Sequence, residues 1–292
     1  MIFTGCSVAI VTPFTSNGDV DYPKFKELIE WQIEQGIDSI TVCGTTGEAS
    51  TLDDEEQIAV TQFCVDVVNK RVPVIAGAGS NDTRHGINLA MNLAKTGVDA
   101  LLLVTPYYNK CSQQGLIEHF NITANAANIP CIIYSVKSRT GVNITPQTVL
   151  ELSKNPNIVA IKEASGDISQ CVDICRIVPS DFAIYSGNDD MLVPLMSIGG
   201  SGYISVLANI APKECSEMAH AYLNGDINRA KNLQLSMKPL IDALFIDVNP
   251  IPVKAALHFL GKIELEYRLP LCKPSEDAML KIKHEMQTLG LI

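Results

Sequence analysis

One lysine in this sequence ends a short apolar segment, and that position makes it the first candidate for chemistry. Lys162 closes the run of residues 157–162, which follows Pro156 and is soon followed by Gly166. A short run rich in β-branched residues is typical of a buried strand. Burial lowers the pKa of a lysine, and the neutral amine can then attack a ketone to form an imine. The alternative is a lysine that only extends to solvent or pairs with Glu163.

Hydroxyl groups end or follow other apolar runs. Thr45 and Thr46 lie in a glycine-bounded turn after one run, Tyr108 follows a second, and Tyr134 ends a third. Threonine hydroxyls bind carboxylates or pass on protons. A tyrosine, with an unperturbed pKa of about 10, acts as a proton shuttle rather than a strong base. Taken alone, the threonines are better explained by a turn with a helix cap, and packing or an interface is an alternative for the pair Tyr107-Tyr108.

Charged residues follow the run that ends in Tyr134 and one further run. Arg139 lies shortly after Tyr134, and its planar guanidinium suits a carboxylate, although an arginine on a surface loop is the better interpretation of this residue alone. Another run ends in Ser186-Gly187-Asn188-Asp189-Asp190. The acidic pair could suggest a divalent metal, but Asn and Asp are favoured at helix N-termini, so helix capping is the simpler interpretation.

Taken together, these side chains suit imine chemistry on a keto acid. The lysine would act as the electron sink, the hydroxyl groups would move protons, and the arginine would hold an anionic group. This requires a fold that brings the ends of several strands to one place.

Eight apolar runs alternate with longer amphipathic segments, the pattern of strands and helices in an α/β protein. We expect strands over residues 8–11, 39–43, 72–76, 100–104, 131–134, 158–162, 183–186 and 203–206. We expect helices over residues 23–35, 54–69, 82–95, 113–127, 146–154, 168–178, 189–198 and 212–223. The pattern predicts a (β/α)8 TIM barrel, in which the C-terminal strand ends meet at one mouth. An open doubly wound sheet is the alternative.

The pattern changes after residue ~225, where only helices are expected, over residues 226–245, 252–260 and 275–289. We therefore divide the chain into a catalytic barrel, residues 1–224, and a C-terminal helical region, residues 225–292. The second part is short for a core of its own, and no low-complexity linker precedes it, so we expect it to pack on the barrel.

The composition narrows the class of protein. The chain has 292 residues, of which 47% are hydrophobic and 18% charged, as expected for a large core. Its net charge of −10, with no Lys/Arg-rich stripe, disfavours nucleic acid as a partner. No apolar stretch reaches the ~20 residues of a membrane span, and the N-terminus lacks the basic region of a signal peptide.

The cysteines and histidines indicate the cellular compartment and bear on whether the protein binds a metal. Nine cysteines, widely scattered and without a Cys-x-x-Cys pair, fit a reducing compartment, so we expect a cytoplasmic protein. The five histidines form no ligand cluster, so we expect no metal and no sensitivity to EDTA.

At these residues the sequence resembles the dihydrodipicolinate synthase family of pyruvate-dependent class I aldolases, over essentially its whole length. Each motif is modest alone, and the order and spacing of the set make the resemblance specific. The motifs are Val11-Thr12-Pro13-Phe14, Gly44-Thr45-Thr46-Gly47-Glu48, Pro106-Tyr107-Tyr108, Tyr134, Ser138-Arg139-Thr140-Gly141, Ile161-Lys162-Glu163 and Gly202-Tyr203-Ile204-Ser205.

The resemblance implies catalytic roles. Lys162 would form the imine with pyruvate, and no other cofactor would be needed. Tyr134 would be the central proton donor and acceptor, with Thr45 and Tyr108 as the rest of the relay. In this family the second tyrosine reaches in from a neighbouring subunit, which implies at least a homodimer; a tetramer built as a dimer of dimers is the usual form.

The resemblance also implies substrate contacts. Thr46, Gly187 and the backbone at Ile204 would contact pyruvate, and Arg139 would bind the second substrate, aspartate semialdehyde. The implied reaction condenses pyruvate with L-aspartate 4-semialdehyde to give 4-hydroxy-tetrahydrodipicolinate, on the way to diaminopimelate and lysine. The nearest alternative is a sister class I aldolase or lyase acting on a sugar-derived 2-keto acid. A noncatalytic sensor of pyruvate and a metal-dependent aldolase are further alternatives.

Two departures from the family pattern stand out. Ser135 and Lys137 replace the common asparagine and proline after the tyrosine, which frees φ in that loop, and we expect activity to survive. Lysine-sensitive relatives often have a glutamate and histidines at the effector site, where this chain has His85, Asp54 and Gln57, while Asn81 and Tyr107 are kept. A missing carboxylate weakens the binding of an ammonium group, so we expect weak or absent feedback by lysine.

Overall fold

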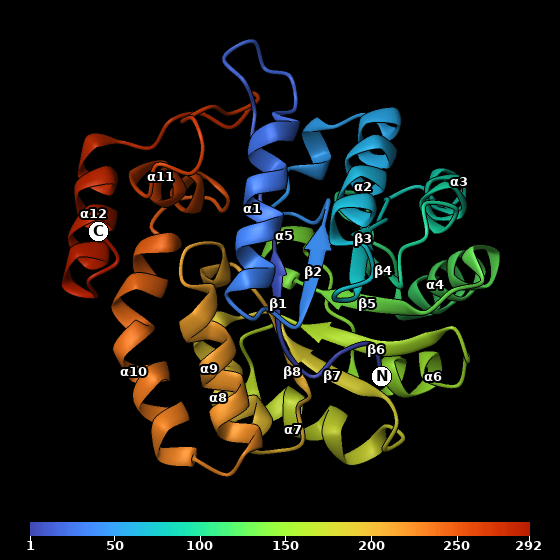
Figure 1. Ribbon diagram of the computed structural model, residues 1–292. Helices are drawn as coiled ribbons and strands as arrows, with labels where there is room; N and C mark the ends of the chain where they lie inside the picture. The colour runs from blue at the N-terminus through green and yellow to red at the C-terminus, as the bar shows by residue number, and fades with distance from the viewer.

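Eight parallel strands close into a barrel in the computed structural model, which describes residues 1–292 (Figure 1). Each strand pairs with its neighbours in chain order, and β1 pairs with β8, so the expected TIM barrel is confirmed and the open sheet is excluded. The strands are β1 Gly5–Ala9, β2 Ser39–Val42, β3 Val74–Gly77, β4 Ala100–Val104, β5 Cys131–Ser135, β6 Ile158–Glu163, β7 Ala183–Ser186 and β8 Gly202–Ser205.

Helices surround the barrel as an outer layer (Figure 1). They are α1 Tyr22–Glu34, α2 Asp54–Val68, α3 Thr83–Ala94, α4 Gln113–Ala127, α5 Lys137–Thr140, α6 Pro146–Leu152, α7 Ile168–Ile177, α8 Leu192–Met196 and α9 Pro212–Leu223, with 3-10 helices η1 Ala49–Thr51, η2 Asp189–Met191 and η3 Leu207–Asn209. Local signals explain several starts: Asp53 and Glu56 form a capping box on α2, and Pro146 and Pro212 begin α6 and α9.

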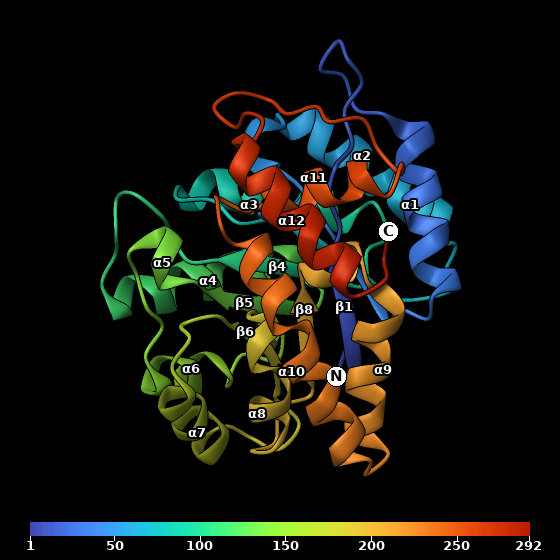
Figure 2. The same ribbon diagram turned by 90° about the vertical axis from the view of Figure 1, so that its left-hand side faces the viewer.

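The C-terminal helices α10 Ile227–Leu244, α11 Ile251–Phe259 and α12 Glu276–Thr288 pack together and against the barrel. They occupy one side of the molecule, which faces the viewer in Figure 2. α10 lies against α8 and α9, and α11 contacts η3 after the last strand. The division that the sequence suggests, between residues 224 and 225, falls between α9 and α10. Among all these helices, none combines the length and the apolar character that a membrane crossing requires.

Two segments differ from the sequence-based expectation. The prediction of a single helix over residues 189–198 is wrong. The segment forms η2 and then the short helix α8, and neither begins with a side-chain cap. Asp189 does not cap this segment; its carboxylate accepts hydrogen bonds from the backbone amides of Val206 and Leu207 instead. The loop expected after β5 forms the short helix α5, which carries Arg139.

Alternation along the strands decides which side chains enter the barrel. A buried cluster inside it includes Ala160 and Ala164, which share a face of β6 and its extension with Lys162, whereas Ile161 belongs to the larger core under the helices. At the N-terminal end, the ring of Phe3 stacks on Tyr185 at 4.2 Å. Lys162 is therefore placed inside the barrel near the C-terminal ends of the strands.

Candidate active site

A pocket of about 820 Å³ lies at the C-terminal mouth of the barrel. It collects side chains from loops that are far apart in the sequence. Six of the eight residues singled out in the sequence line it: Thr45, Thr46, Tyr134, Arg139, Lys162 and Gly187.

Lys162 and Tyr134 stand on neighbouring strands in the same register, β6 and β5. Lys162 is 6% exposed, and its Nζ lies 4.3 Å from the centroid of the Tyr134 ring. Burial lowers the pKa of Lys162 to about 8, the negative charge of Asp189 opposing this shift and the positive charge of Arg139 adding to it. About one Lys162 in ten is thus neutral at pH 7 and able to act as a nucleophile.

Tyr134 is buried as well, and burial raises the pKa of its phenol to about 12, with Arg139 opposing the shift. The phenol therefore stays protonated at neutral pH and can donate a proton to an oxygen that develops negative charge. Beside a neutral lysine amine, a protonated phenol is a group able to donate a proton when water leaves a carbinolamine.

Thr45 and Thr46 are carried by a turn that is fixed from behind by a buried ion pair. Glu48, at the end of the turn, has a left-handed backbone (φ 55°) and accepts a hydrogen bond from Lys254 of α11 at 2.6 Å. Both side chains are fully buried, and the Lys254 ammonium also lies 4.2 Å from the centroid of the Phe14 ring. Burial raises the pKa of Glu48 and lowers that of Lys254, while the mutual attraction of the two charges opposes both shifts.

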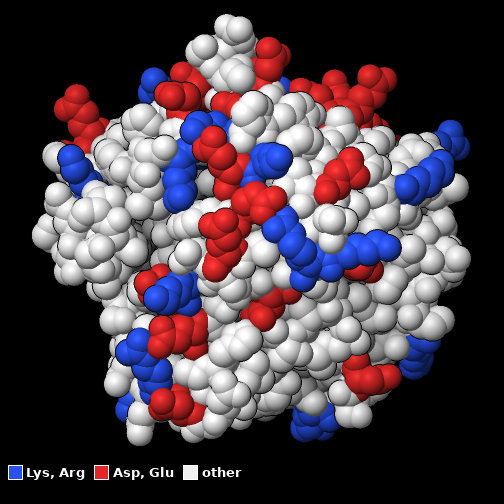
Figure 3. Space-filling model, in the orientation of Figure 1, with Lys and Arg blue, Asp and Glu red and all other residues white.

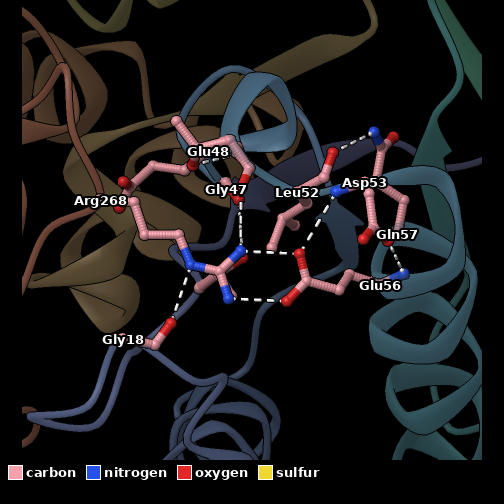
Figure 4. A network of polar contacts seen from close by, with 10 residues as sticks. Gly18, Gly47, Glu48, Leu52, Asp53, Glu56, Gln57 and Arg268 are labelled. Atoms are coloured by element: carbon pink, nitrogen blue, oxygen red, sulfur yellow. Dashed lines mark hydrogen bonds and ion pairs between the residues drawn. The ribbon is translucent and has the colours of Figure 1, made fainter.

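A second cation from the C-terminal region holds the same part of the chain. Figure 4 shows Arg268 reaching the Glu56 carboxylate with two nitrogens, each at 2.7 Å. Its guanidinium also donates to the carbonyl oxygens of Gly18 and Thr51 at 2.9 and 2.8 Å. Since Glu56 belongs to the capping box of α2, Arg268 ties the start of this helix to the C-terminal region.

Asn249, which directly precedes α11, completes the link between the C-terminal region and the pocket. Its side-chain nitrogen donates a hydrogen bond to Thr46 Oγ1 at 2.9 Å, and its backbone carbonyl oxygen accepts one from Arg139 Nη2 at 2.8 Å. Asn249 thereby orients Thr46, which follows β2, and Arg139, which follows β5. Asn249 and Lys254 were not predicted from the sequence, although Lys254 is a lone lysine in the otherwise apolar start of α11.

Gly187 is needed because the backbone after β7 passes close to the lysine stem. A Cβ at this position would lie 2.6 Å from Ala164 Cβ and 3.1 Å from Lys162 Cε. Two residues on, Asp189 is buried and lines the pocket, so the interpretation of this residue as a helix cap is wrong.

The remaining two predicted residues lie outside this pocket. Ile204 is buried on β8 within the barrel cluster. Tyr108 is 92% exposed, and it adopts a left-handed backbone (φ 71°), so in one chain it does not reach Lys162.

Four of the five candidate effector residues, all except Asn81, line a second, adjoining pocket of about 510 Å³. His85 lies there with its Nε2 2.9 Å from the carboxylate of Asp54 and its Nδ1 2.9 Å from Ser80 Oγ. Gln57 and Tyr107 contribute to the same lining.

Other side chains that could bind a metal are dispersed. No group of three or more His, Cys, Asp or Glu residues is arranged to hold a metal ion, and all nine cysteines are free. Acidic and basic side chains are interspersed on the face of the molecule in Figure 3.

Comparison with known proteins places this geometry in a family. Residues 2–289 match the model of the dihydrodipicolinate synthetase family. The chain is 53% identical over 291 residues to the 4-hydroxy-tetrahydrodipicolinate synthase of Acetivibrio thermocellus, covering 100% of this chain and 99% of that protein.

Solved structures of dihydrodipicolinate synthases have the same fold as this chain. The dihydrodipicolinate synthase of Thermotoga maritima is 38% identical with a TM-score of 0.98, and coverage is 100% of both chains. The chloride-inhibited enzyme of Acinetobacter baumannii, in complex with pyruvate, is 44% identical with a TM-score of 0.98, again over 100% of both chains. The chain therefore belongs to the dihydrodipicolinate synthetase family, lyases of the class I aldolase type, as its sequence predicted.

Proposed function

We propose that this enzyme is a 4-hydroxy-tetrahydrodipicolinate synthase, which condenses pyruvate with L-aspartate 4-semialdehyde through an imine on Lys162. The observation that carries the proposal is a buried lysine with a pKa of about 8 in the pocket of a family member. The electron sink is the protonated imine itself, so no additional cofactor or metal is part of the proposal.

In the proposed mechanism, neutral Lys162 attacks the ketone of pyruvate, and Tyr134 supplies the proton with which water leaves. The pyruvate methyl group then loses a proton to give an enamine, whose carbon attacks the aldehyde of the second substrate. The amine of the new product attacks the imine carbon, and Lys162 departs as the ring closes. The Thr46 hydroxyl suits the pyruvate carboxylate, Thr45 extends the relay from Tyr134, and Arg139 suits the carboxylate of the aldehyde substrate.

We also propose that Tyr108 acts in the pocket of a neighbouring subunit, within a homodimer or a tetramer of two dimers. Its exposure, and its absence from the lining of the pocket of its own chain, support an action in trans. Mixing the inactive variants Tyr108→Ala and Lys162→Ala tests this directly. A hybrid site with Lys162 from one chain and Tyr108 from the other regains activity only if the tyrosine acts between subunits.

We place the enzyme in the cytoplasm, where its nine free thiols would stay reduced. This assignment is tested by fractionation of the source cells.

The decisive experiment measures product formation from pyruvate and aspartate semialdehyde, coupled to dihydrodipicolinate reductase and read as loss of NADPH. Wild-type protein should turn over, and borohydride should trap one pyruvate on Lys162. Lys162→Ala should lose roughly 10³-fold or more of the activity and form no adduct. The exposed Lys154→Ala is the matched control and should behave as wild type. Folded wild-type protein without turnover would redirect the assignment to a sister aldolase acting on a sugar-derived 2-keto acid.

A further inference from the structure

The pocket around Lys162 contains a buried carboxylate that the proposed mechanism does not use. Asp189 is 3% exposed and lines the pocket. Its Oδ2 accepts hydrogen bonds from the backbone amides of Val206 and Leu207 at 3.1 and 3.0 Å. Its Oδ1 is also buried but has no hydrogen-bond partner, Lys162 included. One oxygen therefore holds the chain after β8, and the other is a buried acceptor without a donor.

Two more acceptors in the same pocket lack partners. The side-chain oxygens of Asn188 and Asn249 are buried and unpaired, and both residues line the pocket. Buried acceptors without donors are costly, so several in one pocket indicate a ligand that brings the donors with it. An ammonium group has three donors and a positive charge, which match two amide oxygens and one carboxylate oxygen.

We propose that Asp189, assisted by Asn188 and Asn249, binds the α-ammonium group of the aldehyde substrate, and so selects an amino aldehyde over its des-amino analogue. This inference rests on the proposed function, which supplies an α-amino acid aldehyde as the second substrate. Arg139, on the same pocket, takes the α-carboxylate, so the two charges of the amino acid are recognised by separate groups.

The position of the segment agrees with this role. Gly187 packs against the stem of Lys162, and Asn188 and Asp189 follow it directly. An amine bound here lies on the side of the pocket where the imine carbon is held. This is the amine that must attack that carbon when the ring closes.

The test compares aspartate semialdehyde with succinate semialdehyde, which keeps the aldehyde and the carboxylate but lacks the ammonium group. Asp189→Asn retains an oxygen for the amides of Val206 and Leu207 and removes the negative charge. We expect the KM for aspartate semialdehyde to rise by about 10- to 100-fold, the usual effect of losing a charge-assisted hydrogen bond. The inhibition constant of succinate semialdehyde, measured in the same coupled assay, should change by less than about threefold, because that probe makes no ammonium contact.

Asp173→Asn is the matched control, since Asp173 of α7 faces Arg176 at 3.9 Å and does not line the pocket. It should leave the ratio of the two constants near that of wild type. Equal weakening of both aldehydes in Asp189→Asn would overturn the proposal and assign the residue a structural role. A slower borohydride-trapped reaction with pyruvate would overturn it too, since Asp189 would then act on Lys162.

A second measurement needs no variant. In wild-type enzyme, succinate semialdehyde should bind at least about tenfold more weakly than aspartate semialdehyde. Equal binding of the two aldehydes by an active enzyme would overturn the ammonium site alone. Wild-type protein that fails to turn over aspartate semialdehyde would overturn the proposed function, and the ammonium site with it.

Discussion

Lys162 and Tyr134 face each other across adjacent strands, with the lysine nitrogen 4.3 Å from the centre of the phenol ring. Burial lowers the pKa of Lys162 and raises the pKa of Tyr134, so it favours the neutral form of both groups. The neutral form of each group, which burial favours, is the form that imine formation needs.

The pH dependence of imine formation follows from these two groups. With a pKa of about 8, about one Lys162 in ten is neutral at pH 7, against roughly one in three thousand for an ordinary lysine. The value of kcat/KM for pyruvate should therefore rise with pH and level off above about 8. Tyr134 should cause no fall in this range, because its pKa is about 12. A rise that continues to pH 10 would show that the lysine is not perturbed.

Gly187→Ala should impair catalysis through the lysine stem. The added Cβ would lie 3.1 Å from Lys162 Cε and 2.6 Å from Ala164 Cβ, so the lysine must shift. A displacement of this kind costs about 100-fold in kcat when it misplaces a reacting atom. Gly86→Ala on α3 is the control, since its Cβ would meet only ordinary contacts, the nearest being Ser80 Cβ at 3.5 Å. Wild-type rates of pyruvate trapping in Gly187→Ala would contradict this prediction.

The buried pair Glu48–Lys254 should show strong non-additivity. Glu48→Gln leaves a buried, unpaired ammonium and should destabilise the protein by about 3–5 kcal/mol, measured by urea unfolding. Replacing both residues, with Glu48→Leu and Lys254→Met, should cost less than either single change. Glu151→Gln, which removes the exposed pair with Lys154, should cost less than about 1 kcal/mol. If the double variant lost the sum of the two single effects, the pair would not be coupled.

Feedback by lysine should be weak or absent. In the second pocket, the Asp54 carboxylate already pairs with His85, and no glutamate occupies the position of His85. The expected result is little inhibition in the coupled assay, and half-inhibition at submillimolar lysine would contradict it. His85→Glu should increase the sensitivity, because it adds a carboxylate and releases that of Asp54.

Sequence patterns predicted the barrel and most of the pocket for a simple physical reason. Short apolar runs mark strands, parallel strands in a barrel end at one mouth, and Lys162 and Tyr134 occupy such ends. Asn249 and Lys254 escaped prediction because their contacts join residues more than 200 positions apart. The prediction for Asp189 was wrong for a related reason. Asp and Asn usually cap the helix that follows them, whereas the Asp189 carboxylate accepts hydrogen bonds from the more distant amides of Val206 and Leu207.

The contacts of Asn249, Lys254 and Arg268 also bear on the order in which the chain is made. Lys162, Tyr134 and β8, the strand that closes the barrel, are all synthesised before these three residues. Until then the turn with Thr45 and Thr46 lacks its supports, and Arg139 lacks the carbonyl that orients it. Because residues 249, 254 and 268 complete these contacts, the pocket becomes ordered only after all eight barrel strands have been made.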